Sequence, residues 1–476
     1  RAGNDLIMPG EPRHRATILE AIKSGALKIE DLDRNVERIL KTVLKSLSYQ
    51  RYQYSDKPDL KGHAQIARKA AAEGVILLKN ENNTLPLAGG SVNIAAFGVG
   101  SYDFIAGGTG SGDVNNDYTV SLVEGLEEAD LRIDAGLKKR YDTYIKTEKA
   151  KLPEKKFIFE LLPPIPEMPL EEDLLVAKAS DNDIALITIG RNSGEFQDRQ
   201  TGGDFYLTFS EVKMIRSVSQ VFRAAHKKVV VVLNIGNVIE TVSWRDAADA
   251  IVLPWQGGQE AGHALTDVLT DHVNPSGKLP TTFTRTYEDV LNAKDFPGIE
   301  IPDGETHELG GVMTSYEMEI TYHDDIWVGY RHYVSRQVPV AYPFGFGLSY
   351  TTFQYRDLQL SAEQFNGELM VETTIKNTGD TAGKEVVQLY LAAPGKSMEK
   401  PLRELKGFVK TRLLQPNESQ VVTFRLTASE LASFDPEERA WITEAGMYRV
   451  QIGASSTDIR LEEQFSVAEV IVKRVN

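Results

Sequence analysis

The sequence contains no cysteine among its 476 residues. This absence excludes disulfide frameworks, Cys-ligated zinc, iron–sulfur clusters and thiol nucleophiles, and it is compatible with either redox compartment. No run of 18 apolar residues occurs, so we expect no membrane-spanning helix. Basic charge is also not in excess, because 53 lysines and arginines stand against 68 acidic residues, a net charge of −15. That charge is a poor match for nucleic-acid phosphates or anionic lipid.

The composition is that of a folded protein. Apolar residues make up 41% of the chain and charged residues 25%, values close to those of globular proteins. A length of 476 residues predicts two or three domains. The chain begins at Arg1 without a signal-like segment, from which we predict a start inside a longer protein. We favour a periplasmic or secreted location over a cytoplasmic one.

Short apolar runs alternate with helical patterns through residues 57–283. The apolar runs are 74–78, 92–97, 184–189, 229–235 and 250–253, and the helical patterns are 63–73, 120–129, 210–225 and 259–270. This alternation predicts an α/β sandwich with a mostly parallel sheet. Residues 1–56 precede it with one apolar stretch and two helical patterns, which are too few to close a core alone.

The pattern changes after this region. Residues 284–339 are predicted to be a linker, in which the acidic, glycine-bearing stretch 301–319 forms an exposed insertion loop. Residues 340–476 contain short runs with partial period-two alternation, separated by turn signals. We expect strands at 369–376, 385–392, 420–426, 447–452 and 465–472. Such regular short strands predict an immunoglobulin-like β-sandwich.

A glycine-rich stretch, residues 98–112, follows the apolar run 92–97. A dinucleotide site is one reading, but Asp103 stands where the third glycine of that motif would be, and the next helical pattern begins only near residue 119. A plain structural loop is a second reading. The reading that we favour is a polar ligand loop, in which backbone N–H groups and Ser111 meet a hydroxylated substrate.

A second loop, residues 190–199, directly follows the apolar run 184–189. Loops at the carboxyl ends of strands in an open α/β sheet are where ligands bind. Glu195 in this loop suits acid/base chemistry, although a surface ion pair is an equally good explanation from spacing alone. Asp198 and Arg199 could form one salt-bridged turn. No metal-binding pattern of histidines is present in the sequence, and we expect neither a metal nor a cofactor.

Several separated motifs resemble those of glycoside hydrolase family 3, the β-glucosidase-like group, and they occur in the family's order. They are residues 2–10 (AGNDLIMPG), 71–80 (AAEGVILLKN), 190–195 (GRNSGE), 274–280 (NPSGKLP), 328–331 (VGYR) and 343–351 (PFGFGLSYT). The resemblance implies a layout of four parts. Residues 1–56 would be the last strand and closing helices of a TIM-like barrel, and residues 57–283 an α/β sandwich. Residues 284–339 would be a linker and insertion loop, and residues 340–476 a fibronectin type III-like domain.

The resemblance also implies a chemistry. It points to a retaining exo-β-glycosidase, most simply a β-glucosidase, with Glu195 as the general acid/base and Ser111 as a hydrogen-bonding partner of a substrate hydroxyl. Asp198 and Arg199 would support the loop. The family's nucleophilic aspartate lies in a Ser-Asp-Trp-like motif, which this sequence does not contain, so the resemblance implies that this chain alone is incomplete. The acid/base carboxyl should have a raised pKa.

Other interpretations stay open at this point. A carbohydrate-binding or scaffold fragment without catalysis of its own is the first alternative, and a nucleotide-binding α/β protein is the second. The expected partners are a β-linked oligosaccharide or glucoside and the missing barrel segment, with no nucleic acid and no membrane. The 301–319 insertion is able to reach a neighbouring subunit, so a homodimer is also considered.

Overall fold

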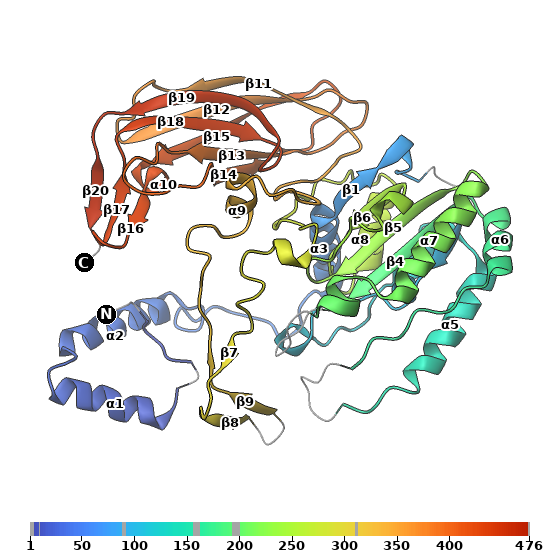
Figure 1. The fold of residues 1–476 in the computed structure, drawn as a ribbon, viewed down its shortest axis with the longest axis horizontal. Coiled ribbons are helices and arrows are strands. Elements are labelled where there is room, and N and C mark those ends of the chain that lie inside the picture. Colours follow the sequence, from blue (N-terminus) through green and yellow to red (C-terminus); the bar gives the residue numbers. More distant parts are fainter. Residues whose placement is uncertain are drawn as a thin grey trace. The chain divides into compact units, whose positions relative to one another are not determined.

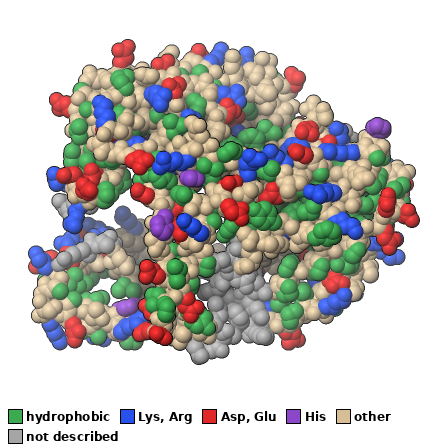
Figure 2. All heavy atoms as spheres, viewed as in Figure 1, with side chains coloured by type: hydrophobic (Ala, Val, Ile, Leu, Met, Phe, Trp, Pro, Cys, Tyr) green, Lys and Arg blue, Asp and Glu red, His purple; other side chains and the backbone are tan. Residues whose placement is uncertain are grey.

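The computed structural model describes residues 4–8, 10–87, 92–155, 162–192, 200–309 and 313–474. The chain divides into two units, residues 1–61 and residues 62–476, and each is described by itself. Among the described residues, no helix is both long enough and apolar enough to cross a bilayer. In the view of Figure 2, acidic and basic side chains are interspersed over the surface.

The first unit contains two helices, α1 (Pro12–Lys23) and α2 (Ile29–Lys45). α2 begins with acidic residues and ends with a lysine, which complements the helix dipole. Arg38 of α2 forms an ion pair with Asp5 at 2.6 Å, and Asn35 donates to the Asn4 carbonyl. These contacts hold the start of the chain against α2.

A six-stranded sheet is the centre of the second unit (Figure 1). Its order is β1-β6-β5-β4-β2-β3, with β1 antiparallel to β6 and the other neighbouring pairs parallel. The strands are β1 (Ile76–Asn80), β2 (Asn93–Phe97), β3 (Arg132–Ile133), β4 (Ile184–Arg191), β5 (Lys228–Ile235) and β6 (Ala250–Leu253). The apolar runs of β4 and β5 are buried on both faces, as expected of central parallel strands. The predicted mostly parallel sheet is confirmed.

Helices cover both faces of this sheet (Figure 1). One core forms against α5 (Ala135–Lys149), α6 (Glu172–Asp181) and α7 (Phe209–Ala224). The opposite core forms against α3 (Leu60–Gly74), α4 (Leu122–Glu128) and α8 (Ala261–Leu269). α5 and α6 were not among the helical patterns expected from the sequence.

α4 and α8 cross with backbone against backbone. A Cβ atom on Gly262 would overlap the Ser121 carbonyl group, and one on Gly125 would overlap the backbone of Gly262. Because a backbone carbonyl cannot move aside as a flexible side chain can, only glycine allows this approach.

We therefore expect Gly262→Ala to lower the free energy of unfolding by about 1–3 kcal/mol in urea denaturation. Gly74→Ala is the matched control, since a Cβ on Gly74 meets nothing within 4 Å. Equal midpoints for the two variants would show that α4 and α8 can separate without cost.

The segment after the sheet contains more regular structure than the predicted loop. It forms β7 (Ile299–Glu300) paired with β10 (Met318–Glu319), and β8 (Thr306–Leu309) paired with β9 (Met313–Tyr316). The expectation of a loop over 301–319 is corrected, because antiparallel pairing satisfies backbone groups that an extended insertion would leave to water. The short helix α9 (Tyr330–Ser335) follows and is anchored by Tyr330, which stacks on Phe344.

A β-sandwich completes the chain, which confirms the predicted C-terminal fold class. One sheet has the order β11-β12-β15 and the other β14-β13-β18-β19, around a shared apolar core. The strands are β11 (Phe353–Leu360), β12 (Glu368–Asn377), β13 (Val386–Ala392), β14 (Glu404–Lys410), β15 (Ser419–Thr427), β18 (Gly446–Gly453) and β19 (Ile459–Val467), with a small sheet of β16 (Ser433–Asp435), β17 (Ala440–Thr443) and β20 (Ile471–Arg474).

One expected strand of this sandwich was wrong. The predicted run 465–472 is divided between β19 and β20, which belong to different sheets. The sandwich is fixed to the α/β layer by polar contacts, including Lys278 with Glu385 at 2.8 Å and the Gln388 amide with the Gly345 carbonyl at 3.0 Å.

Candidate active site

The loops that follow three strands of the sheet, β2, β4 and β6, are joined to one another at the carboxyl edge of the sheet. Asn234, near the end of β5, is fully buried. Its amide oxygen accepts from the Ile105 N–H at 2.6 Å, and its amide nitrogen donates to the carbonyls of Ile105 and Trp255. One side chain therefore ties the loop after β2 to the loop after β6.

The loop after β4 is included in the same arrangement. The Gln256 amide donates to the Arg191 carbonyl and to the Asn192 side-chain oxygen, both at 3.3 Å. The Gly258 N–H also donates to the Ala106 carbonyl at 2.8 Å. Loops at this edge of an open α/β sheet are positioned to receive a ligand.

A buried ion pair lies at the base of the β4 loop. Arg191 donates to both carboxylate oxygens of Glu211 at 2.5 and 2.6 Å, with 10% and 6% of the two side chains exposed. Glu211 also accepts from the N–H and the hydroxyl of Thr208, the N-cap of α7. The pair thus fixes the last residue of β4 to the start of α7, just before the chain enters the loop that contains Glu195.

A second carboxyl, Glu167, lies under the same edge. It accepts from the Val99 N–H at 3.0 Å. Burial raises the pKa of the Glu167 carboxyl to about 8, and the Val99 N–H and the Arg191 guanidinium offset this effect only in part. Burial therefore keeps the Glu167 carboxyl protonated at neutral pH.

Glu167 should make stability depend on pH. Its pKa is about 8 in the folded chain against 4.5 without the fold, so the stabilisation is fully present below pH 4.5 and is lost as pH rises through 8. We expect the Tm of the wild-type protein to fall relative to that of Glu167→Gln between about pH 5 and about pH 8.5. Glu154→Gln, at an exposed position, is the control. Parallel pH curves for wild type and Glu167→Gln would contradict the assignment.

The structure describes one of the four site residues predicted from the sequence. Ser111 is exposed in the turn Gly110–Gly112 of the loop after β2. Glu195, Asp198 and Arg199 lie outside the described residues, and their predicted roles stay predictions.

The glycine-rich stretch does not have the geometry of a dinucleotide motif. Gly98 has a φ of +87°, and a Cβ there would overlap the Thr188 carbonyl of β4. The following helix of more than three residues, α4, begins only at Leu122. Gly98 therefore serves the close approach of β2 and β4, and no long helix points its N-terminus at the loop.

Two residues that join the loops were missed in the sequence, Asn234 and Gln256. Asn234 had a detectable signal, since it is the polar residue near the end of the otherwise apolar run 229–235. Buried polar side chains in such a strand must be hydrogen-bonded, so this position predicts a structural or functional contact. Gln256 had no comparable signal.

The fold and the joined loops define a modular α/β protein with a fibronectin-like sandwich at its C-terminal end. The model of the glycosyl hydrolase family 3 C-terminal domain matches residues 75–350, and that of the fibronectin type III-like domain matches residues 385–456. The chain therefore belongs to glycosyl hydrolase family 3.

Relatives in this family carry related names. Beta-glucosidase A of Butyrivibrio fibrisolvens is 35% identical over 447 residues, which cover 84% of this chain and 50% of that protein. Thermostable beta-glucosidase B of Acetivibrio thermocellus is 32% identical, with coverage of 99% and 57%. The solved structure of beta-glucosidase 3B from Thermotoga neapolitana in complex with glucose is 45% identical, with a TM-score of 0.88 over 100% of this chain and 65% of that one. The chain spans about half to two thirds of the length of these proteins.

Proposed function

We propose that the protein containing this chain is a retaining exo-β-glycosidase, a β-glucosidase that removes terminal non-reducing β-D-glucosyl residues from oligosaccharides. The observation that carries the proposal is the likeness, over the whole of this chain and at 45% identity, to a beta-glucosidase whose structure is in complex with glucose. The loops joined by Asn234 and Gln256 support it, because they form a fixed edge that includes Arg191 and Asn192, which precede the loop of Glu195 in sequence.

In the proposed mechanism, Glu195 gives its proton to the glycosidic oxygen while an aspartate carboxylate attacks the anomeric carbon. The bond from that carbon to the leaving oxygen breaks, and a glycosyl–aspartate ester forms. Glu195, now ionised, then removes a proton from water, which attacks the same carbon and releases the sugar and the aspartate. The aspartate is supplied by the barrel segment that the family resemblance implies.

The other predicted site residues have supporting roles in this proposal. The Ser111 hydroxyl hydrogen-bonds a hydroxyl of the terminal sugar, which an exposed position in the loop after β2 permits. Asp198 and Arg199 orient the loop of Glu195. A retaining mechanism places the two reacting carboxyls about 5–5.5 Å apart.

The test is the stereochemistry of the first product. Proton NMR recorded during hydrolysis of a β-glucoside by the complete protein should show β-glucose first and α-glucose only after mutarotation. Release of α-glucose first would replace the proposal with an inverting mechanism, and no hydrolysis of any β-glycoside would refute it.

A further inference from the structure

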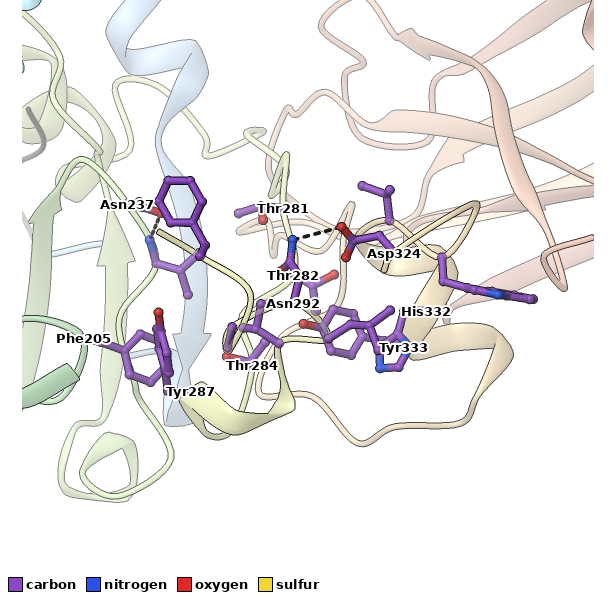
Figure 3. Close-up of a pocket in the computed structure, with 18 of the residues that line it drawn as sticks. Phe205, Asn237, Thr281, Thr282, Thr284, Tyr287, Asn292, Asp324, His332 and Tyr333 are labelled. Carbon is purple, nitrogen blue, oxygen red and sulfur yellow. Dashed lines mark hydrogen bonds between the residues drawn. The ribbon is translucent and has the colours of Figure 1, made fainter. Parts of the chain in front are cut away.

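A cavity with a volume of about 770 Å³ lies beside the loops described above. This volume is within the roughly 300–1,000 Å³ range of small-molecule sites. Figure 3 shows Phe205 and Tyr287 on one side, and Asp324, His332 and Tyr333 on the other. The first side belongs to the α/β layer and the turn after it, and the second to the segment that ends in α9.

The lining suits a neutral, hydroxylated ligand. Asp324 is the one Asp, Glu, Lys or Arg among the described residues that line the cavity. Burial and the nearby Arg336 lower the pKa of His332, so that its ring is neutral at pH 7. Aromatic rings offer apolar faces, while threonine hydroxyls, the Asn292 amide and the Asp324 carboxylate offer hydrogen bonds.

Two polar groups of the lining lack partners. Thr282 and Thr284 are 7% and 3% exposed, and neither side-chain hydroxyl has a hydrogen-bond partner among the described residues. By contrast, the Asn292 amide donates to Asp324 at 3.1 Å, which holds these two groups of the lining in place. Because the two hydroxyl oxygens are themselves shielded, the hydrogen-bonding groups that this part of the lining offers to a ligand are the Asn292 amide and the Asp324 carboxylate.

The cavity is placed at the same sheet edge as the candidate active site. Asn237 and Val238 of the lining follow β5, whose Ile235 is in register with Arg191 at the end of β4. Gln200 and Thr201 of the lining follow, in sequence, the loop that contains Glu195. A substrate held at this edge of the sheet is therefore able to reach the cavity.

We propose that this cavity binds a neutral pyranose ring on the leaving-group side of the scissile bond and so favours longer oligosaccharides over simple glucosides. This assignment rests on the proposed function, which supplies the class of substrate. It predicts that the residues lining the cavity affect long substrates more than short ones.

The first test compares kcat/KM for a β-linked glucotetraose with kcat/KM for 4-nitrophenyl β-glucoside in the complete protein. Asn292→Ala should lower the ratio of the two values about tenfold, as expected for the loss of one hydrogen bond to a ligand. Asp324→Asn, which keeps the size of the side chain, should lower the ratio in the same direction. Asn366→Ala, at an exposed position of the β-sandwich, is the control and should leave the ratio unchanged.

The second test separates this proposal from the proposed function. Calorimetric titration of the Glu195→Gln protein with the tetraose should show saturable binding that Asn292→Ala weakens about tenfold. If the wild-type protein hydrolyses no glycoside, the proposed function fails, and this titration alone decides the role of the cavity. An unchanged dissociation constant and an unchanged kinetic ratio would overturn the cavity assignment, which is also the result expected if another part of the polypeptide fills the cavity.

Discussion

Glu195→Gln should lower kcat for a glucoside with a poor leaving group by roughly 10²–10⁴-fold in the complete protein. Glutamine has nearly the shape of glutamic acid but cannot give a proton to the leaving oxygen. A 2,4-dinitrophenyl glucoside needs little protonation, so the rate at which its sugar is transferred to the enzyme should fall much less. The alkaline limb of the pH–rate profile, which reports ionisation of the acid, should disappear for the poor substrate.

Asp198→Asn is the matched control for this result. Because Asp198 is proposed to orient the loop, its replacement should lower the rates on both substrates by a similar and smaller factor. If the loss of rate in Asp198→Asn depended on the leaving group as strongly as the loss in Glu195→Gln, the acid role would have been assigned to the wrong residue. Equal rates for wild type and Glu195→Gln on both substrates would remove Glu195 from the mechanism.

Arg191→Met should lower the free energy of unfolding by about 3–5 kcal/mol, because it leaves the Glu211 carboxylate buried without its cation. The double variant Arg191→Met/Glu211→Gln should recover at least half of that loss. Glutamine carries no charge and still accepts the hydrogen bonds from Thr208 at the start of α7. Chemical denaturation of the two variants and the wild type measures both effects.

The control pair for this prediction is exposed. Arg425 and Glu368 lie 2.8 Å apart with more than half of each side chain accessible, so Arg425→Met should cost no more than about 1 kcal/mol. Equal losses for Arg191→Met and Arg425→Met would show that the buried pair contributes no more than a surface one. A double variant as unstable as Arg191→Met alone would show that an isolated charge is not the cause.

The sheet could be predicted from the sequence because its central strands are buried on both faces. β4, β5 and β6 were found within one or two residues, since an uninterrupted apolar run has few other uses in a soluble domain. β11 was missed because it alternates half-buried and exposed residues and is interrupted at Asp357, where φ is positive. Its pattern resembles that of a surface loop.

The missed helices have a different cause. α5 buries only Leu137, Tyr141 and Ile145 of its 15 residues, a narrow stripe at a spacing of four. Charged residues dominate the remaining face, so apolar periodicity is weak even though the helix is long. A covering helix with so few apolar residues is therefore harder to predict than the strands beneath it.

The candidate site could be predicted only in part. Its loops are marked by motifs, but the contacts that join them connect residues far apart in sequence, such as Asn234 with Ile105. No local pattern encodes which loop a buried amide will meet. The cavity beside the site is likewise built from four separate segments, and composition alone does not reveal it.

The central claim is that Glu195 acts as proton donor and then as base in a double displacement. The most direct measurement is hydrolysis of 2,4-dinitrophenyl β-glucoside by Glu195→Ala in the presence of sodium azide. Azide needs no base, so it should take the place of water at the glycosyl–enzyme ester, raise the turnover rate and yield β-glucosyl azide. No acceleration and no azide product, in a protein whose wild type hydrolyses the same substrate, would contradict the claim.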